Sequence, residues 1–403
     1  MYFAASISAA PPTPTAGFFL YFLNCMANTG TRFLSLDVFR GITVCFMIIV
    51  NTPGSGSRSF GPLNHASWHG FTPTDLVFPS FLFVVGNAMS FAMQKYHALG
   101  TGAVLTKVAK RTALIFLLGY LMYWFPFFRL SPSGDLLPFP ISETRIWGVL
   151  QRIAVCYGLA SLLVYFGTFR QVVIVSVLAL VGYWLLLLTF GNAADPLAPT
   201  GNAVLRLDRF MLGDDHLYHS NGLIFDPEGL LSTLPALVNV VVGYYAGVFV
   251  QQRGKGYEAI AKLLLTGVTF IFLALCWDQV FPINKKLWTS PFVLLTTGLD
   301  LCIMATLIYV VEVRAWTAGN WTRFFVIPGK NPLFIYLLSE LLAITLYMIP
   351  AGGGVSLFDY INNLIFQPLA PGPVGSLLFA LSFMLLCWAA GWWLDRRRIY
   401  IRV

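Results

Sequence analysis

Two histidines lie in a polar stretch between the first two long apolar segments of the chain. The stretch covers residues 52–72 and carries His65 and His69 within N-H-A-S-W-H-G. An imidazole has an unperturbed pKa of about 6.5, so it can accept a proton at neutral pH. An ionisable group held at the mouth of a membrane bundle indicates a functional site. The competing interpretation is a solvated loop histidine beside a tryptophan that anchors the chain at the membrane interface.

Three neighbours of these histidines have side chains that suit the same chemistry. Asn51 ends the first apolar segment and Asp75 opens the second, so both are expected at the same membrane face as His65. Asp75 would orient an imidazole or bind a cationic amine; alternatively, it only caps the helix that begins in T-P-T-D. Trp68 could offer a flat wall for a sugar ring, or serve as an interfacial anchor.

Further titratable groups occur in the segment D-D-H-L-Y-H, residues 214–219. Histidine and carboxylate side chains on one side of the membrane are the minimum requirement for a metal site. However, this spacing matches no standard zinc pattern, and HxxxH in a loop differs from HExxH on a helix. We therefore predict no metal site.

The segment F-D-P-E-G-L-L-S-T-L-P precedes a later apolar run. Pro227 close to a helix start, with Asp226 and Glu228 in the first turn, is typical of a helix N-terminus. The two carboxylates could instead contact substrate hydroxyls or an amine. The sequence contains neither GxGxxG nor a Walker loop, so it gives no support for a nucleotide site of those types.

Four more charged residues lie within or at the ends of apolar segments. Asp37 and Arg40 are three residues apart, so a local ion pair is expected. Asp300 and Glu340 fall within apolar segments, where a carboxylate costs a few kcal/mol unless it is protonated or paired. They would line a polar passage or join two helices. A passage would suit the alternative function, a multi-pass transporter of a small polar solute.

The composition predicts the fold class. Of the 403 residues, 57% are hydrophobic and 10% are charged, and apolar runs of about 18 or more residues recur along the chain. This pattern predicts an all-α, polytopic helical membrane protein with about ten transmembrane helices. The expected spans are 36–51, 73–94, 109–127, 146–166, 171–190, 230–250, 260–278, 291–311, 331–349 and 374–394.

Basic residues predict the orientation of these spans. With the N-terminus inside, 17 of the 25 Lys and Arg residues fall on the inner side, in the shorter loops. Both termini are therefore predicted to be cytoplasmic, in a multi-pass protein of the cell (inner) membrane. The net charge of +8 is explained by this orientation, and no nucleic acid is predicted as a partner. The six cysteines contain no CxxC and are interpreted as packing residues.

The beginning of the chain differs from the rest. It lacks a charged segment before its apolar patch, so it makes a poor signal peptide. Met26 begins M-A-N-T-G-T-R-F, which would be a more natural start. We expect residues 1–30 to be a disordered or peripheral tail, with residues 1–25 an upstream extension, and residues 31–403 to form one transmembrane domain.

Five motifs, which occur in this order along the chain, together indicate a known family. They are S-L-D-V-F-R-G, H-A-S-W-H-G-F-T-P-T-D-L-V-F-P, R-I-W-G-V-L-Q-R-I-A, F-D-P-E-G-L-L-S-T-L-P and P-I-N-K-K-L-W-T-S-P-F. From about Arg32 onward the chain resembles the transmembrane acyltransferase family of heparan-α-glucosaminide N-acetyltransferase. The resemblance implies transfer of an acetyl group from cytosolic acetyl-CoA to a glucosamine amine across the membrane. It also implies that His65 and Asn51 correspond to the family's histidine and asparagine.

From this resemblance we expect roles for the candidate residues. His65 would act as general base or transient acyl carrier, with Asn51 as a donor to the oxyanion and Asp75 as the partner of the imidazole. The expected substrate contacts are Trp68, His69, Asp226 and Glu228. Arg145 and Arg152 would bind phosphate groups of the acetyl-CoA co-substrate, or else pair with Glu143 and its neighbours.

The sequence also differs from lysosomal members of this family, which carry an added soluble domain and an extra N-terminal helix. Neither is seen here, so we expect a bacterial-type member. Its acceptor would then be a small amino sugar or a cell-envelope glycan. The other expected partner is the lipid bilayer, and a homodimer is left open.

Overall fold

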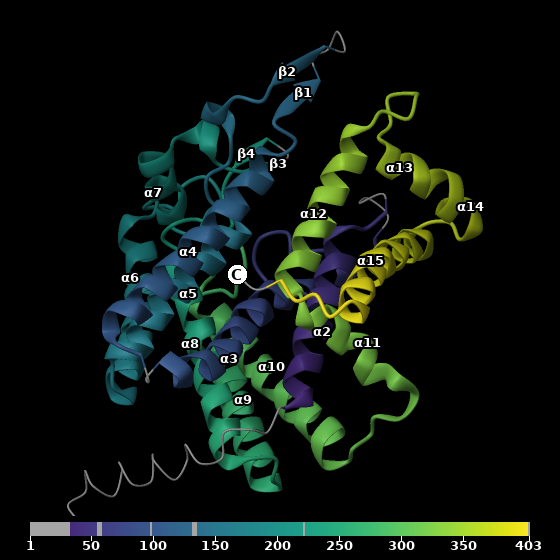
Figure 1. The fold of residues 1–403 in the computed structure, drawn as a ribbon. Coiled ribbons are helices and arrows are strands. Elements are labelled where there is room, and N and C mark those ends of the chain that lie inside the picture. The colour runs from purple at the N-terminus through teal and green to yellow at the C-terminus, as the bar shows by residue number, and fades with distance from the viewer. Residues whose placement is uncertain (1–32, 55–58, 97–98, 131–134, 221, 402–403) are drawn as a thin grey trace, which may run out of the picture. The chain divides into compact units, whose positions relative to one another are not determined.

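The computed structural model describes residues 33–54, 59–96, 99–130, 135–220 and 222–401. Residues Leu34–Val403 form one compact unit, which is built almost entirely of α-helices (Figure 1). The predicted all-α fold class is thereby confirmed. The predicted N-terminal tail, residues 1–30, lies outside the described residues.

Within the described residues, eight helical segments are long and apolar enough to cross a membrane. They are α2 (Leu34–Asn51), η3 with α3 (Pro73–Leu76 and Val77–Tyr96), α5 (Val149–Phe166), α6 (Phe169–Phe190), α8 (Thr233–Arg253), α9 (Tyr257–Asp278), α10 with η6 (Ser290–Leu307 and Ile308–Val313) and α15 (Pro373–Arg396). Each corresponds to one of the ten predicted spans, with ends that differ by a few residues.

The other two predicted spans have a different character. Helix α4 (Thr101–Trp124) covers most of the predicted span 109–127, but it begins earlier and includes Lys107, Lys110 and Arg111, so it falls short of the apolar criterion. Helix α12 (Pro332–Met348) follows α11 (Trp321–Lys330), and the axis bends by 77° between them. With this bent pair counted as one span, nine segments among the described residues are long and apolar enough to cross a membrane, and α4 lies at the tenth predicted position.

Short elements lie between the long helices. They are η2 (Gly61–Leu63), β1 (Phe128–Leu130), β2 (Leu136–Pro138), η4 (Ile141–Glu143), α7 (Ala203–Leu212), η5 (Asp214–His216), β3 (His219–Ser220), β4 (Leu223–Ile224), η7 (Ala318–Asn320), α13 (Leu357–Ile361), η8 (Asn362–Phe366) and α14 (Gln367–Leu369). Strand β1 pairs antiparallel with β2, and β3 with β4.

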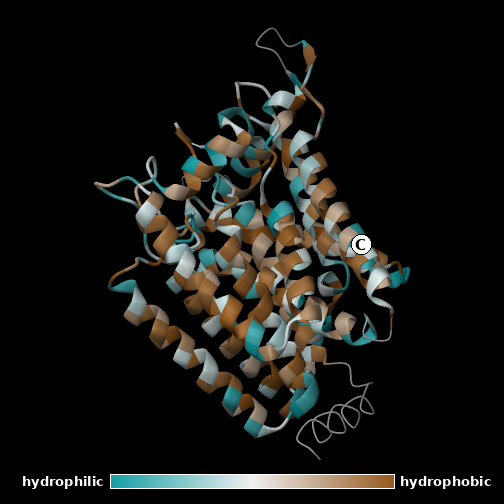
Figure 2. Ribbon diagram, turned by 90° about the vertical axis from the view of Figure 1, so that its left-hand side faces the viewer, coloured by the Kyte–Doolittle hydropathy of each residue, from teal (hydrophilic) through white to brown (hydrophobic). Residues whose placement is uncertain are grey.

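Helices α6 and α9 turn apolar side chains outward. Only 28% of the apolar stretch of each helix is buried, and Leu178 and Leu265 are more than 60% exposed. Figure 2 shows hydrophobic residues along the helices and hydrophilic ones concentrated toward the loops. Apolar side chains exposed over a whole helix face are explained by contact with lipid, which agrees with a multi-pass membrane protein.

Small residues bring α3 and α8 into backbone contact at the centre of the bundle. A Cβ atom added at Gly86 would lie 1.9 Å from the Val240 carbonyl oxygen, and one added at Gly243 would lie 2.0 Å from the Phe83 carbonyl oxygen. In a membrane the association of helices depends on such close packing, because lipid removes the hydrophobic drive between them. The pair α3 and α8 therefore forms a tight central seam.

We expect Gly243→Val to prevent correct assembly, because its side chain would overlap the Phe83 backbone, which cannot rotate away. Overpacking of this kind costs about 1–3 kcal/mol where side chains can yield, and more is expected against a backbone. Gly182→Val on α6 is the matched control, since an added Cβ there meets nothing within 4 Å. The measurement is the monodisperse yield and melting temperature in detergent; equal values for both variants would contradict this packing.

The loops that the charge pattern predicts on one side of the membrane contact one another. Trp68 Nε1 donates to the Leu197 carbonyl oxygen at 2.9 Å, and Ile146 N donates to the His216 carbonyl oxygen at 3.3 Å. These contacts join three loops that are far apart in sequence. The grouping of loops agrees with the predicted alternation of spans, while the cytoplasmic position of both termini stays a prediction.

Candidate functional site

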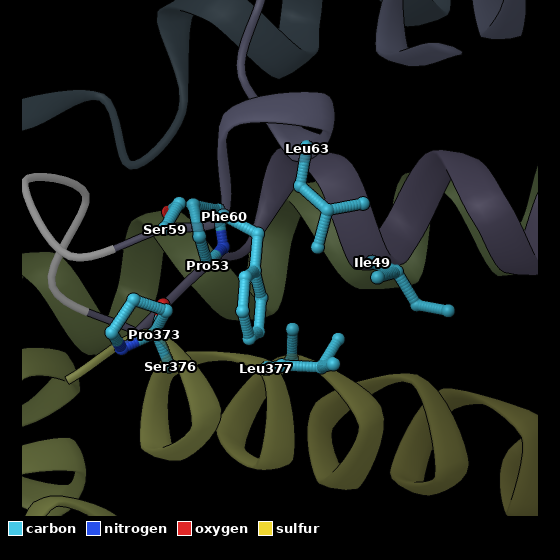
Figure 3. A pocket seen from close by; sticks show the side chains of 9 residues that line it. Ile49, Pro53, Ser59, Phe60, Leu63, Pro373, Ser376 and Leu377 are labelled. Carbon is cyan, nitrogen blue, oxygen red and sulfur yellow. The ribbon is translucent and has the colours of Figure 1, made fainter. Parts of the chain in front are cut away.

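The loop that carries the two histidines is anchored against α15. Phe60 and Leu63 of the loop line a small apolar pocket together with Leu377 of α15 (Figure 3). The backbone N–H of Gly54 also donates to the Ser376 carbonyl oxygen, at 3.4 Å. One end of the loop is thus held by α15, and the histidine segment follows directly after it.

His65 and Asp75 form a hydrogen-bonded pair. His65 Nδ1 lies 2.7 Å from Asp75 Oδ1, with the imidazole 45% exposed and the carboxylate 1% exposed. An ionised carboxylate only accepts hydrogen bonds, so Nδ1 carries the hydrogen and Nε2 keeps its lone pair. The arrangement leaves an accessible basic nitrogen next to a buried carboxylate, as a general base or a nucleophile requires.

Asp75 also caps the helix that follows it, so both hypotheses for this residue hold at once. Its Oδ2 accepts from the backbone N–H groups of Ala66 and Thr72, and from Thr72 Oγ1, at 3.0–3.2 Å. Together with Thr72 it completes a capping box at the start of η3. Because the cap fixes the carboxylate, it also fixes the direction from which the imidazole is held.

A lysine that the sequence analysis assigned no role completes this group. Lys285 Nζ lies 3.1 Å from each ring nitrogen of His65. Its neighbour Lys286 donates to the Ser67 carbonyl oxygen at 2.7 Å, and its Nζ lies 5.7 Å from the centre of the Trp68 ring. In the sequence, Lys285 is marked only by the motif P-I-N-K-K. No spacing rule predicts that this motif contacts a loop more than 200 residues earlier in the chain.

Trp68 and His69 lie in the same loop as His65, and their described polar and ring contacts are with other residues. The Trp68 ring packs edge-on against Phe225, with centroids 5.3 Å apart. His69 is exposed, and its Nδ1 lies 3.3 Å from Asn284 Nδ2. One side of the tryptophan is thus packed and the residue is partly buried, which is compatible with the predicted substrate wall and with a structural role.

Arg145, Asp226 and Glu228 pair with one another. Arg145 makes two hydrogen bonds to Asp226, at 2.9 and 2.6 Å, and one to Glu228 Oε2 at 2.7 Å. Although burial alone would raise the pKa of Glu228, the charges of Arg145 and Arg152 hold it below its ordinary value. A predicted phosphate-binding residue and two predicted substrate-binding residues therefore satisfy each other.

Two details of the prediction for this region are wrong. Glu143, named in the alternative interpretation as a partner of Arg145 and Arg152, pairs instead with Arg129 at 2.7 Å. Asp226 and Glu228 are not in the first turn of a helix, because α8 begins at Thr233. Helix geometry does not extend back to them because Asp226 Oδ1 accepts from the Glu228 N–H at 3.0 Å, a turn-type bond that competes with helix.

Arg152 lies one turn inside α5 and is fully buried. Its Nη2 donates to the Gly229 carbonyl oxygen at 3.1 Å and to Ser232 Oγ, and its guanidinium lies 4.8 Å from the centre of the Trp288 ring. Its Nε and Nη1 have no hydrogen-bond partner among the described residues. The predicted role in phosphate binding thus concerns a residue that is enclosed by protein.

Asn51 is held by another helix. Its Nδ2 donates to Glu340 Oε1 at 3.0 Å, linking α2 to α12. The described contacts of Asn51 thus lead to Glu340 and not to His65, although the amide has a second N–H with which it could donate to an oxyanion.

The other in-span charges behave as structural contacts. Ser80 Oγ donates to Asp300 Oδ1 at 2.5 Å, linking α3 to α10. The predicted ion pair between Asp37 and Arg40 is confirmed, at 3.3 Å. Of the two interpretations left open for Asp300 and for Glu340 above, the described contacts match the joining of helices.

The histidines of the segment 214–219 bind backbone oxygens. His216 Nδ1 lies 2.7 Å from the Thr144 carbonyl oxygen, and His219 Nε2 lies 2.9 Å from that of Asp214. Within the described ranges, no cluster of three or more His, Cys, Asp or Glu side chains is arranged to hold a metal ion.

Asp208, a buried carboxyl near this site, gives a test of its electrostatics. Its Oδ1 accepts from the Leu230 N–H at 2.9 Å, and burial raises its pKa from 3.8 to about 7. The folded protein thus keeps a proton that the unfolded chain releases near pH 4. The stability that this proton contributes is complete below about pH 4 and is lost as the pH rises through about 7.

We therefore expect Asp208→Asn to become more stable relative to wild type as the pH rises from 4 to 8, by an order of a few kcal/mol. Asparagine keeps the acceptor for Leu230 and cannot ionise. Melting temperatures of both proteins across this pH range provide the measurement. A difference that is the same at both ends of the range would show that Asp208 does not hold the proton.

Comparison with known proteins relates the sequence of this chain to one family. Residues 32–204 match the sequence model of the family described as heparan-alpha-glucosaminide N-acetyltransferase, catalytic. The human protein named heparan-alpha-glucosaminide N-acetyltransferase is 30% identical over 363 residues, which covers 77% of this chain and 53% of the relative. The mouse protein of the same name is 27% identical over 369 residues, covering 78% of this chain and 54% of the relative.

This chain thus spans about half the length of the curated relatives it matches. The matched family region contains His65, Asp75, Arg145 and Arg152. The similarity to the human protein extends beyond that region over most of the chain. By sequence, residues 32–204 belong to the catalytic region of the heparan-alpha-glucosaminide N-acetyltransferase family, and the similarity to its members extends over most of the chain.

Proposed function

We propose that the protein transfers an acetyl group from acetyl-CoA to the amine of a glucosamine-type sugar or glycan. The donor would bind from the cytosol, and the acceptor would lie on the far side of the cell membrane. The observation that carries this proposal is the contact between His65 and Asp75, which leaves Nε2 of an accessible imidazole as the base. The human and mouse relatives are named for acetyl transfer to a glucosamine, which supports an amino sugar as the substrate class.

The chemistry requires a neutral amine, since an ammonium has no lone pair to attack a thioester. His65 would take the proton from the amine at Nε2, or would carry the acetyl group itself for a moment. Asp75 would stabilise the imidazolium that forms and keep Nδ1 protonated. Asn51 would donate to the oxyanion with its second amide N–H; loss of one such donor typically costs about 10²–10³-fold in rate.

The remaining predicted site residues have supporting parts in this proposal. Trp68 and His69 follow His65 in the same loop and would face the sugar. Asp226 and Glu228 hold Arg145, so their contribution to substrate binding would come through its position. Arg152 has two unpartnered nitrogens among the described residues, which supports a phosphate or carbonyl of the donor as its ligand.

The experiment uses purified protein in sealed vesicles, with amino sugar inside and radiolabelled acetyl-CoA outside. Labelled N-acetyl sugar inside the vesicles, formed by wild-type protein only, is the expected result. A panel of glucosamine and a glucosamine oligosaccharide would identify the acceptor, and N-acetylglucosamine, whose amine is already acetylated, is the negative control. Uptake of labelled sugar without acetyl-CoA, and no acetylated product, would instead support a transporter and contradict the proposal.

A further inference from the structure

Lys285 lies outside the region matched by the family model, and its Nζ contacts the imidazole of His65. It lies 3.1 Å from both ring nitrogens. Equal distances to both ring nitrogens place Nζ over the face of the imidazole, whereas the Nε2 lone pair lies in the ring plane and stays open to a substrate. The base of the proposed reaction therefore lies within 3.1 Å of a proton donor.

The segment around Lys285 is fixed against the histidine loop on both sides. The Gly70 N–H donates to the Ile283 carbonyl oxygen at 2.8 Å, and Lys286 reaches the Ser67 carbonyl oxygen at 2.7 Å. Within the segment itself, Asn284 Oδ1 accepts from the Leu287 N–H at 2.8 Å and so bridges the turn that carries Lys285. Lys285 is thus brought to His65 by a braced backbone, and its position does not depend on side-chain length alone.

The surroundings of Lys285 combine both signs of charge. Asp75 and Glu228 favour its ammonium, while Lys286 and Arg152 disfavour it, and the imidazole of His65 lies in direct contact. Burial has the largest effect and lowers the pKa of Lys285 below its ordinary value. An ammonium in such a setting gives up a proton more readily than a solvated lysine does.

We propose that Lys285 is a catalytic residue that passes the proton of the acceptor amine from His65 to the leaving thiolate of coenzyme A. The inference rests on the proposed function. It adds to it a proton donor for the leaving thiolate and a step that regenerates the base.

The atoms balance as follows in a direct transfer. The amine approaches Nε2 in the plane of the ring, its nitrogen bonds to the carbonyl carbon, and its proton passes to Nε2. The carbon–sulfur bond breaks, and its electron pair stays on sulfur. Lys285 donates one proton from Nζ to that sulfur and becomes a neutral amine. The imidazolium then returns the Nε2 proton to Lys285, so the protein is unchanged and the products are the amide and the thiol.

The test compares Lys285→Met and Lys285→Arg with wild type, using two acetyl donors. One donor is acetyl-CoA, and the other is the acetyl thioester of 4-nitrothiophenol, whose thiolate leaves without needing a proton. With acetyl-CoA we expect both variants to lose about 10²–10⁴-fold in rate, the usual contribution of a positioned acid. Arginine keeps the positive charge but does not release its proton, so Lys285→Arg should not restore the rate with acetyl-CoA. With the nitrophenyl donor the loss should shrink to less than about tenfold.

Two outcomes would contradict proton transfer by Lys285. A rate near wild type in Lys285→Arg would show that only the charge matters, and equal losses with both donors would exclude proton delivery to sulfur. Lys262→Met, which removes an exposed lysine paired with Glu258 on α9, controls for loss of a cation and should behave as wild type. No transfer by wild type from either donor would overturn the proposed function itself, a result distinct from the others.

Discussion

Replacing His65 by alanine is expected to abolish acetyl transfer while leaving the protein folded. The imidazole is 45% exposed, and its described contacts are limited to Asp75 and Lys285. Its loss therefore removes little packing. A positioned general base typically contributes about 10²–10⁴-fold in rate, and a histidine that also carried the acetyl group would contribute more. Turnover of radiolabelled acetyl-CoA and the melting temperature are measured on the same preparation.

The matched control for this prediction is His219→Ala. His219 is also an exposed loop histidine, and its ring bonds only to the Asp214 carbonyl oxygen among the described contacts. We expect it to keep activity close to wild type. Normal turnover by His65→Ala would remove the imidazole from the reaction. A melting temperature that falls sharply in His65→Ala would show that the residue serves the fold.

Replacing Arg145 by methionine is expected to destabilise the protein by about 3–5 kcal/mol, because it leaves two buried carboxylates without their cation. Asp226 is fully buried, and the side chain of Glu228 is 10% exposed. Both lie within 3 Å of Arg145. The expected result is a large fall in melting temperature or in the yield of folded protein, measured in detergent at neutral pH.

Two further variants make this prediction specific. Arg129→Met removes a half-exposed pair with Glu143, and exposed pairs of this kind contribute less than about 1 kcal/mol. The triple variant Arg145→Met, Asp226→Asn, Glu228→Gln removes all three charges together, and it should recover much of the stability lost by Arg145→Met alone. If Arg145→Met melts like Arg129→Met, the three side chains do not form a buried charge network.

The membrane architecture could be predicted from the sequence because it follows from local composition. A run of apolar residues must either cross the bilayer or enter a core, and the predicted spans around α2, α8 and α15 needed no knowledge of their neighbours. The prediction fails where the decision depends on contacts. The helix α11 and its 77° bend into α12 occur where Asn331 and Pro332 interrupt the backbone pattern, and packing then decides whether the two halves count as one span.

For the candidate site, the sequence by itself determined which kinds of group lie near the first loop. His65 and Asp75 are ten residues apart, so the helix start that Asp75 caps also places its carboxylate close to the imidazole. The tertiary structure alone decided the rest. Arg145 meets Asp226 across 81 residues, and Lys285 meets His65 across 220. The sequence shows which residues are charged but not which of them form pairs, because pairing depends on how the helices bring distant loops to one end of the bundle.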